Sequence, residues 1–514
     1  MLAIMEVGPV PPASAQVQVP ADFTNDGIVG GLDEPNSFAF LPDGRILLTE
    51  QRTGNVRMVV NGAIASTDPV LTVPNLQTVG YERGLQGITV DPAWPARPFV
   101  YLAYTRTGDR FRIVRYTASG NLTDPNSGTL SLATPLLLID DILDESIAHQ
   151  AGCLRFGPDG MLYASIGDDG YDCEAFDIGS LHGGILRLRV AALPTGGGPQ
   201  VSRASITPPD NPFISNPDPD ARLLFAWGFR NPWRFQVDRV TGTLYGCDVG
   251  DENFEEMNEM HAGNFMGWPY REANFSLVQP GCPEPGGVGA VPYVAPIAAY
   301  PHGPGSSAVT SAGMYRPVPG AANNWPTGYY RDRGDVFYSD YFAGELRRLT
   351  WTGSQWVPAA PVPGQPNASS WAAGLVSAVD FLVGPDGSLW WMAQFNGSFD
   401  PLSGSVNRIR YTGVSVGPPT LADEGLRARP NPFSREVELS FRLAGRESAR
   451  LRIFDLAGRT VRILFAGDAP AGETRVRWDG TAAAGAAAPA GLYFARLERA
   501  GRAPAAAIQL LLGR

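Results

Sequence analysis

The residues best suited to chemistry lie in three polar segments, each placed where a strand is expected to end. They are residues 146–152, with a histidine and a glutamine; residues 227–234, with an Arg-Asn pair; and the acidic residues 247–259, followed by 264–269. Imidazole can accept a proton near neutral pH, guanidinium can stabilise developing negative charge, and clustered oxygens can bind a hard cation. Any role for histidine falls on the four in the sequence: His149, His182, His261 and His302.

The basic residues narrow the possible functions. All 40 of them are arginine, because the sequence contains no lysine. Schiff-base enzymes, kinases and P-loop NTPases depend on a lysine, so these classes are excluded. The formal net charge of −11 argues against nucleic-acid binding, since phosphate contacts need a basic face. No apolar run approaches the roughly 20 residues needed to cross a bilayer.

A degenerate repeat would position the polar segments. Each copy is a short strand, a tight turn that is Pro-Asp-Gly in the best copies, and a second strand rich in β-formers. The copies lie at residues 38–48, 87–101, 154–163, 235–245, 335–349 and 381–390. The 60 glycines and 46 prolines also favour many short strands joined by turns. We therefore predict an all-β fold, a six-bladed β-propeller of units of about 65 residues each.

The C-terminal residues differ in composition and form a second predicted domain. Residues 437–443, 449–454, 474–478 and 491–497 alternate apolar and polar side chains, as strands with one buried face do. About 85 residues of this kind predict a small β-sandwich. The predicted organisation is a signal-peptide remnant or disordered tail at 1–20, the propeller at 21–413, a linker at 414–426 and the sandwich at 427–514.

The N-terminus and the cysteines indicate export. Ala13-Ser14-Ala15 before a polar residue is similar to a signal-peptidase site, with a disordered tail as the alternative. The four cysteines allow three pairings into two disulfides, and none has the CxxC spacing of a zinc site. Sequential pairing, Cys153 with Cys173 and Cys247 with Cys282, would close two modest loops and fits an exported protein. We expect a secreted or cell-surface protein, with the periplasm as second choice.

The three polar segments, in this order, resemble the glucose/sorbosone dehydrogenase family, the soluble quinoprotein sugar dehydrogenases that use pyrroloquinoline quinone (PQQ). Further matching motifs lie at residues 81–87, 181–187 and 299–302, and the resemblance spans residues 25–412. It implies an enzyme that oxidises an aldose or related carbohydrate at the anomeric carbon and delivers electrons to an external acceptor. Animal hedgehog-interacting proteins share this propeller and act by binding.

The resemblance also implies roles for individual residues. His149 matches the base that accepts the proton of the C1 hydroxyl, and Arg230 with Asn231 matches the pair that stabilises the quinone oxyanion. The implied cofactor-binding residues are Glu82, Gln150, Arg230 and Asn231.

Calcium is the family's usual helper at the quinone. Its implied position is at the main-chain carbonyls around Gly250 and Asp251, within a strongly acidic loop. A second acidic loop, residues 168–172, is a further candidate, although it lacks the full EF-hand pattern. The alternative for both loops is a solvated turn.

The chain departs from the family pattern where the three carboxylates of PQQ are expected to bind. The family's lysine falls near Phe342, and its arginine pair falls near Ser377 and Val379. The acid that precedes the family histidine is replaced by Ala148. Other arginines could supply the missing contacts: Arg83, Arg316 and Arg347.

Two alternative functions follow. The first is a non-catalytic cell-surface propeller that binds glycan or protein, which the missing cationic residues favour. The second is a calcium-dependent hydrolase of the lactonase type, another class of six-bladed propeller. Trp227, Trp390 and Trp391 are expected to pack between blades, with sugar stacking as the alternative.

The C-terminal domain resembles FlgD-type immunoglobulin-like domains and the sorting domains of type IX secretion. The matching residues lie at 431–433, 454–459, 478–480 and 490–493. The resemblance implies export across an outer membrane, with the secretion machinery as partner and the domain as address or anchor. A passive spacer domain is the alternative.

Overall fold

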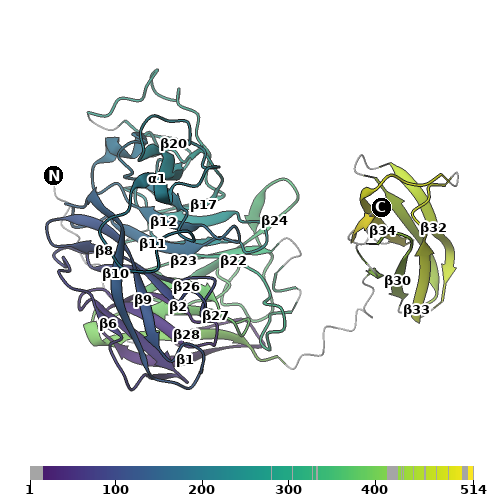
Figure 1. Cartoon of the computed structure of the whole chain (residues 1–514), viewed down its shortest axis with the longest axis horizontal. Coiled ribbons are helices and arrows are strands. Elements are labelled where there is room, and N and C mark those ends of the chain that lie inside the picture. Colours follow the sequence, from purple (N-terminus) through teal and green to yellow (C-terminus); the bar gives the residue numbers. More distant parts are fainter. Residues whose placement is uncertain are drawn as a thin grey trace. The chain divides into compact units, whose positions relative to one another are not determined.

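The computed structural model describes residues 16–278, 281–303, 305–326, 328–330 and 334–413, and residues 426–512 with gaps at 430, 432, 444, 456–458, 471, 484–485 and 500–507. The chain divides into two compact units, Met1–Gly413 and Val414–Arg514 (Figure 1). The predicted signal-peptidase site and nearly all of the predicted linker lie outside the described residues. Within them, no helix is long and apolar enough to cross a membrane.

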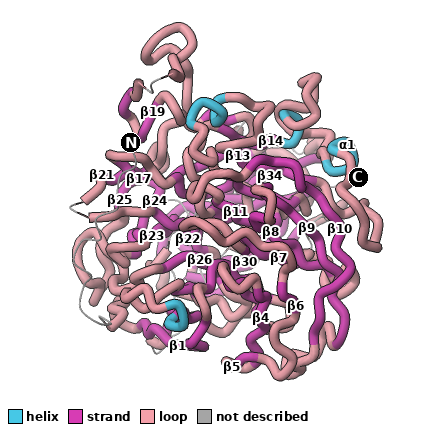
Figure 2. The backbone as a smooth tube through the Cα atoms, turned by 90° about the vertical axis from the view of Figure 1, so that its left-hand side faces the viewer, coloured by secondary structure: helices cyan, strands magenta, loops and turns pink. Residues whose placement is uncertain are grey.

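The N-terminal unit consists mainly of strands and loops, with a few very short helices (Figure 2). Its described residues form six sheets of four or five strands. The first three sheets contain β2 (Pro35–Phe40), β3 (Ile46–Glu50), β4 (Asn55–Val60), β5 (Ala63–Ile64) and β6 (Leu71–Thr72); β7 (Leu85–Val90), β8 (Phe99–Arg106), β9 (Arg110–Gly120) and β10 (Leu130–Leu143); and β11 (Ala151–Phe156), β12 (Leu162–Ile166), β13 (Gly184–Leu188), β14 (Leu224–Trp227) and β18 (Asn264–Phe265).

The other three sheets contain β15 (Phe235–Val237), β16 (Leu244–Asp248), β17 (Phe254–Met260) and β21 (Ala298–Pro301); β22 (Val309–Tyr315), β23 (Asp335–Asp340), β24 (Leu346–Trp351) and β25 (Trp356–Pro358); and β26 (Ala378–Val383), β27 (Leu389–Ala393), β28 (Gly404–Tyr411) and β1 (Phe23–Leu32). A small hairpin pairs β19 (Arg271–Glu272) with β20 (Phe275–Ser276). The helical segments are α1 (Arg203–Ile206) and the 3-10 turns η1 (Asp172–Phe176), η2 (Ala221–Leu223) and η3 (Pro401–Ser403).

The sheets form a ring because the first strand of each packs against the first strand of the next. Contacts run from β2 through β7, β11, β15, β22 and β26, and β26 returns to β2. The N-terminal strand β1 pairs with β28, which joins the two ends of the unit within one sheet. A ring of this kind leaves few exposed sheet edges. The predicted all-β propeller fold is confirmed.

The repeated Pro-Asp-Gly motif forms the turn between the first two strands of three sheets. The glycines have positive φ, which side-chain-bearing residues rarely adopt: Gly44 at 96°, Gly160 at 74° and Gly387 at 84°. In each turn an aspartate oxygen accepts the backbone N–H two residues later at 3.1 Å. The polar segments before β11 and after β12 therefore lie at the other end of their strands, and the segment after β16 lies opposite the β15–β16 turn in the same way.

Buried charged groups link the innermost strands of the ring. Asp380 on β26 accepts hydrogen bonds from the Ser37 hydroxyl on β2 (2.9 Å) and from the Arg155 guanidinium on β11 (2.5 Å). Arg234, directly before β15, donates to the backbone carbonyl of Asn36 at 2.9 Å. All of these side chains are buried. The network thus joins four of the six sheets.

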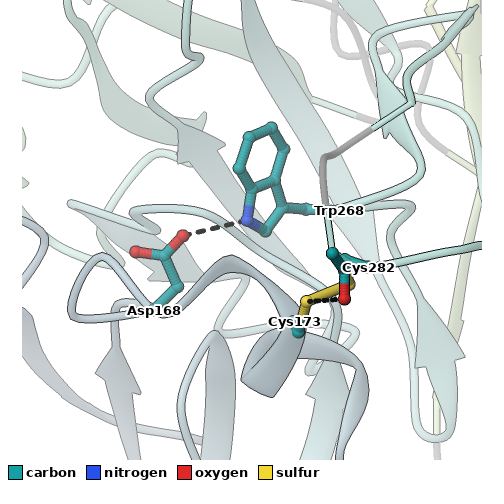
Figure 3. The surroundings of a disulfide bond; sticks show 5 residues. Asp168, Cys173, Trp268 and Cys282 are labelled. Atoms are coloured by element: carbon teal, nitrogen blue, oxygen red, sulfur yellow. Dashed lines mark hydrogen bonds between the residues drawn. A yellow bond between two sulfur atoms is a disulfide. The ribbon is translucent and has the colours of Figure 1, made fainter. Parts of the chain in front are cut away.

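The four cysteines form one disulfide, so the sequential pairing considered from the sequence does not occur. Cys173 in η1 pairs with Cys282 (Figure 3). Cys153 and Cys247 are buried thiols. Cys153 lies on β11 and Cys247 on β16, where both side chains pack in hydrophobic clusters between strands. The two loop cysteines meet because the chain returns to η1 after β20. Proximity in sequence did not predict this tertiary contact.

The C-terminal unit is a sandwich of two antiparallel sheets. One contains β29 (Arg427–Arg429), β30 (Val437–Leu443) and β33 (Gly472–Trp478), and the other contains β32 (Thr460–Ala469), β31 (Glu447–Phe454), β34 (Gly491–Arg499) and β35 (Ile508–Leu512). Apolar side chains from both sheets share one core, which includes Phe441, Leu451, Trp478 and Leu497. This arrangement confirms the predicted immunoglobulin-like sandwich.

Candidate functional site

His149 lies in a tightly held loop at the entry to β11. Its φ of 68° is unusual for a residue with a side chain, and such strain is often found at functional sites. The carboxylate of Asp169 accepts the backbone N–H groups of Glu145 (2.7 Å) and Ser146 (2.8 Å). These contacts fix the loop and therefore the position of the imidazole.

A buried carboxylate orients the His149 ring. Its Nδ1 lies 2.7 Å from Oδ1 of Asp168, which follows β12 and is fully buried. The other oxygen of Asp168 accepts the indole N–H of Trp268 at 2.9 Å (Figure 3), and Oδ1 also accepts the N–H of Gly170 at 2.8 Å. Burial acts to raise the pKa of Asp168, but the His149 ring, Arg230 and the Gly170 hydrogen bond outweigh it and hold the pKa below its usual value.

This pairing decides which ring nitrogen can do chemistry. Because ionised Asp168 accepts the proton on Nδ1, the lone pair of Nε2 is left to accept a proton. No group in the described part of the chain hydrogen-bonds to Nε2, and the His149 side chain is 18% exposed. His149 therefore has the geometry of a general base.

Glu82 ties His149 to the Arg-Asn segment. One of its oxygens accepts the backbone N–H groups of His149 (2.9 Å) and Gln150 (3.0 Å), and the other accepts the amide of Asn231 at 2.9 Å. Glu82 precedes β7, while Asn231 precedes β15. One carboxylate thus connects three sheets and brings four of the predicted residues together.

Arg230 contacts the predicted calcium-binding turn directly. Its guanidinium donates to the carbonyl oxygen of Gly250 at 2.7 Å and to the carboxylate of Asp251 at 2.8 Å. The backbone N–H groups of Arg230 and Asn231 are anchored by Asp248, at 3.0 and 2.7 Å. The Arg-Asn pair and the acidic turn therefore form one unit.

Three of the predicted cofactor-binding side chains keep a buried polar atom without a hydrogen-bond partner among the described residues. These atoms are Oε1 of Gln150, Nε of Arg230 and Oδ1 of Asn231. The amide nitrogen of Gln150 is engaged, since it donates to the carbonyls of Ser146 and Ala148. Unsatisfied buried polar atoms are uncommon, and three of them in neighbouring segments call for an explanation such as a ligand.

Carboxylates make this region acidic. Burial, followed by the neighbouring carboxylate of Asp168, raises the pKa of Asp172 to about 6, and the charges of Arg230, Asp251 and His149 also act on it. The side chain of Asp172 has no hydrogen-bond or ion-pair partner among the described residues. Excess negative charge of this kind suits a cation.

The described residues contain no cluster of three or more histidine, cysteine or acidic side chains placed to hold a metal. The predicted second calcium loop is occupied otherwise, because Asp168 binds His149 and Asp169 binds the loop before it. Calcium near Gly250 and Asp251 stays a prediction.

The N-terminal unit matches the Glucose / Sorbosone dehydrogenase family over residues 32–284. Residues 32–284 therefore form a glucose/sorbosone dehydrogenase domain. The C-terminal unit matches the FlgD Ig-like domain over residues 431–501. The resemblances to the glucose/sorbosone dehydrogenase family and to FlgD-type immunoglobulin-like domains are therefore confirmed, while the likeness to type IX sorting domains stays a prediction.

Two curated proteins are similar to part of this chain. The HIPL1 protein of Arabidopsis thaliana is 30% identical over 215 residues, 39% of this chain and 30% of the relative. The aldose sugar dehydrogenase YliI of Escherichia coli is 26% identical over 257 residues, 50% of this chain and 64% of the relative. The matched region thus spans less than two thirds of either relative.

A solved structure supports the fold. The PQQ-bound form of aldose sugar dehydrogenase from Streptomyces coelicolor superposes with a TM-score of 0.54 at 22% identity, over 76% of this chain and 99% of that one. At this identity the likeness concerns the propeller fold.

In this glucose/sorbosone dehydrogenase propeller, the arginines suggested as substitutes for the missing cations have other partners. Arg83 is buried and pairs with Asp109 at 3.2 Å. Arg316 pairs with Asp238, and Arg347 pairs with Glu345 and lies over the Tyr300 ring. Among the described residues, Arg230 is the guanidinium in contact with the candidate site.

The other three histidines are explained without catalysis. His182 binds Glu174 through Nδ1 and the Leu143 carbonyl through Nε2. His302 binds Glu255 at 2.8 Å, and this hydrogen bond raises the pKa of His302. His261 is exposed and contacts Glu259.

Trp227, Trp390 and Trp391 pack in the propeller, as expected from the sequence. Trp390 and Trp391 are buried, and their indole N–H groups bind Asp386 and Asn25. The Trp227 ring packs against Phe213 and Phe265.

A buried acid behind the His149 loop makes stability depend on pH. Burial raises the pKa of Asp144 to about 7. Because the unfolded pKa is near 4, only the folded protein holds this proton between roughly pH 4 and 7, so stability falls as pH rises through that window. We expect Asp144→Asn, which resembles the protonated acid, to be more stable than wild type at pH 8 by on the order of 2–4 kcal/mol and equal to it at pH 4.

Urea unfolding of both proteins at the two pH values measures this difference. Asp43→Asn, in an Asx turn on another sheet, is the control and should show no such pH-dependent gain. A wild-type protein as stable at pH 8 as Asp144→Asn would contradict the raised pKa.

Proposed function

We propose that this protein is an exported quinoprotein oxidoreductase that oxidises an aldose or related carbohydrate at its anomeric carbon. The observation that carries the proposal is the His149–Asp168 pair, which leaves Nε2 of His149 without a hydrogen-bond partner among the described residues, while Arg230 also acts on the charge of Asp168. The sugar dehydrogenases among its relatives support the same reaction class.

Arg230 fits the carbonyl end of PQQ, because it offers an unsatisfied Nε–H donor next to the acidic turn. The unsatisfied oxygens of Gln150 and Asn231 are acceptors, so they fit an N–H group of the cofactor or a hydroxyl group of the sugar. When bound, PQQ would accept the hydride from C1 of the sugar, and an external acceptor would reoxidise it. Arg230, Asn231, Gln150 and Glu82 are the residues that would hold it.

The protein's own part in the reaction is proton transfer and charge placement. Nε2 of His149 accepts the proton of the C1 hydroxyl as hydrogen leaves C1, and the carboxylate of Asp168 stabilises the resulting imidazolium. Glu82 fixes the positions of His149 and Asn231 relative to each other through its hydrogen bonds to both, while Arg230 supplies fixed positive charge.

Calcium would supply the positive charge that binding of PQQ needs at this site. The cofactor carries three carboxylates, and Arg230 is the guanidinium that contacts the site among the described residues. Loss of one charge-assisted hydrogen bond costs about 1.5–3 kcal/mol, so binding of the anionic cofactor needs further positive charge. We propose that calcium at the Gly250 carbonyl and the Asp251 carboxylate supplies it, with Arg230 sharing these oxygens.

A second candidate function is non-catalytic binding of glycan at the cell surface. The missing lysine and the engaged arginines favour it, because they reduce the affinity for a tricarboxylate. The ordered site residues favour the enzyme.

Export is also a proposal. The Cys173–Cys282 disulfide supports an oxidising compartment, and the FlgD Ig-like domain supports an address or anchor function. Release of the intact chain into the medium of a producing strain, lost on deletion of residues 427–514, would test the role of the domain. Unchanged release would contradict it.

The test of the enzyme is a titration of the purified protein with PQQ, with and without calcium, that follows the cofactor spectrum. Aldoses and an artificial electron acceptor are then added. We expect PQQ to bind only with calcium, and sugar to bleach the oxidised cofactor. No binding up to high micromolar PQQ in the presence of calcium would leave the glycan-binding candidate.

A further inference from the structure

Exposed apolar side chains border the candidate site on one side. Their exposed fractions are large for such residues: Val79 at 68%, Tyr81 at 62%, Ile147 at 42% and Tyr171 at 39%. These four residues are named the exposed rim. Single exposed apolar residues need no explanation, but a contiguous group beside a polar site often marks a binding surface.

Hydrogen bonds connect three residues of the exposed rim through the segment 145–147, and Val79 lies two residues before Tyr81. The backbone N–H of Tyr81 donates to the carbonyl of Ile147 at 2.7 Å, and a Cβ on Gly80 would lie only 2.8 Å from the Ile147 backbone. The hydroxyl of Tyr171 donates to Glu145 at 2.8 Å. Tyr81 and Tyr171 thus flank the segment 145–147, whose ends are at most about 7 Å apart.

The exposed rim is rigid. Asp169 holds the backbone of Glu145 and Ser146, as described above for the His149 loop. One face of the Tyr171 ring stacks on His182 at a centroid distance of 6.1 Å. A surface that is already ordered loses little conformational entropy when a ligand binds.

The exposed rim is also continuous with the candidate site. Tyr81 is followed by Glu82, Ile147 lies two residues before His149, and Tyr171 is followed by Asp172. Aromatic rings therefore alternate with the carboxylates of Glu82, Glu145 and Asp172. Rings can pack against the C–H faces of sugars while carboxylates accept hydrogen bonds from hydroxyl groups.

We propose that the exposed rim binds the further sugar rings of a neutral oligosaccharide whose reducing-end sugar lies at His149. The placement of the reducing end rests on the proposed function, whereas binding along the exposed rim does not. A protein partner usually covers about 800 Å² per side, far more than four side chains offer. The carboxylates of Glu82, Glu145 and Asp172 oppose anionic sugars such as uronates.

Calorimetry on the full-length protein tests this inference without relying on turnover. The probes are the tetrasaccharides of β-1,4-glucose, β-1,4-xylose, β-1,4-mannose and α-1,4-glucose, each compared with its monosaccharide. We expect at least one tetrasaccharide to bind at least tenfold more tightly than its monosaccharide. Tyr81→Ala should weaken that binding three- to tenfold and leave monosaccharide binding unchanged.

Two variants serve as controls. Tyr81→Phe keeps the ring and should retain the affinity, while Val240→Ala, an equally exposed apolar residue in the β15–β16 turn, should change nothing. Equal affinity for tetrasaccharide and monosaccharide in all four series, no sugar binding at all, or no effect of Tyr81→Ala would overturn the inference.

The same data separate this inference from the proposed function. Tetrasaccharide binding without any PQQ-dependent sugar oxidation would leave the exposed rim and remove the enzyme. Oxidation of monosaccharides with no effect of chain length on binding would support the enzyme and overturn the inference about the exposed rim.

Discussion

Replacement of Asp168 by asparagine is expected to lower kcat for sugar oxidation by about 10²–10⁴ while the KM for sugar changes little. Asp168 accepts hydrogen bonds on both oxygens, from His149 and Gly170 on one and from Trp268 on the other. Asparagine has a single acceptor oxygen. If that oxygen faces His149, the amide N–H₂ meets the indole N–H of Trp268, and two donors face each other.

The other orientation of the amide also removes the base. An N–H₂ group that faces His149 donates to Nδ1, so the ring proton moves to Nε2, which can then no longer accept a proton. The amide additionally lacks the charge that stabilises the imidazolium. Either way, the effect falls on the chemical step and not on sugar binding.

Steady-state kinetics with PQQ, calcium and an artificial acceptor measure the effect, and circular dichroism checks the fold. His149→Ala should cause a loss of similar size, since the two residues act as one unit. Trp268→Phe removes one hydrogen bond to Asp168 and keeps the pair, so a loss of no more than about tenfold is expected. Activity in Asp168→Asn within a factor of three of wild type would rule out the pair as the base.

Local signals in the sequence predicted most of the fold. The Pro-Asp-Gly turns could be predicted because their chemistry lies within three residues: glycine permits positive φ, and aspartate accepts the N–H two positions on. The disulfide could not, since Cys173 and Cys282 are 109 positions apart in sequence and meet only through the folded loops.

The candidate site was predicted in part. The sequence indicated His149, Arg230 and the turn at Gly250, and the structure connects them through Glu82, Asn231 and Asp251. The sequence offered Asp168 only as part of a second candidate calcium loop or a solvated turn, because an acidic run looks the same whether its carboxylates bind metal, water or a histidine. The available signal was position: Asp168 directly follows β12, whose partner β11 directly follows the His149 loop. Trp268 gave no local signal, since its indole reaches Asp168 from a different part of the chain.

Replacement of Asp380 by asparagine is expected to lower the free energy of unfolding of the propeller by about 3–5 kcal/mol. Asp380 is fully buried and is the carboxylate that pairs with Arg155, at 2.5 Å, and lies 3.8 Å from Arg234. Both guanidinium groups are buried, and burial lowers the pKa of Arg234. Without the carboxylate, two buried positive charges stay unneutralised on adjacent innermost strands.

The size of this effect follows from burial. Asp26 also contacts two arginines, Arg408 and Arg410 at 2.9 Å each, but its side chain is 26% exposed, whereas that of Asp380 is fully buried. Exposed pairs contribute about 0–1 kcal/mol, so Asp26→Asn is a matched control with a small expected effect. Urea unfolding of full-length variants, followed through the transition of the propeller, compares the two substitutions.

A double-mutant cycle distinguishes charge pairing from general disruption of the core. If the cost arises from the unpaired charge of Arg155, then Arg155→Gln should recover part of it in the Asp380→Asn background, with a coupling energy of at least about 1 kcal/mol. Additive effects would show that Asp380 acts mainly through its hydrogen bonds to Ser37 and to the backbone N–H of Phe38. Because β2, β11, β15 and β26 meet at this carboxylate, its loss should destabilise the ring as a whole and not one sheet alone.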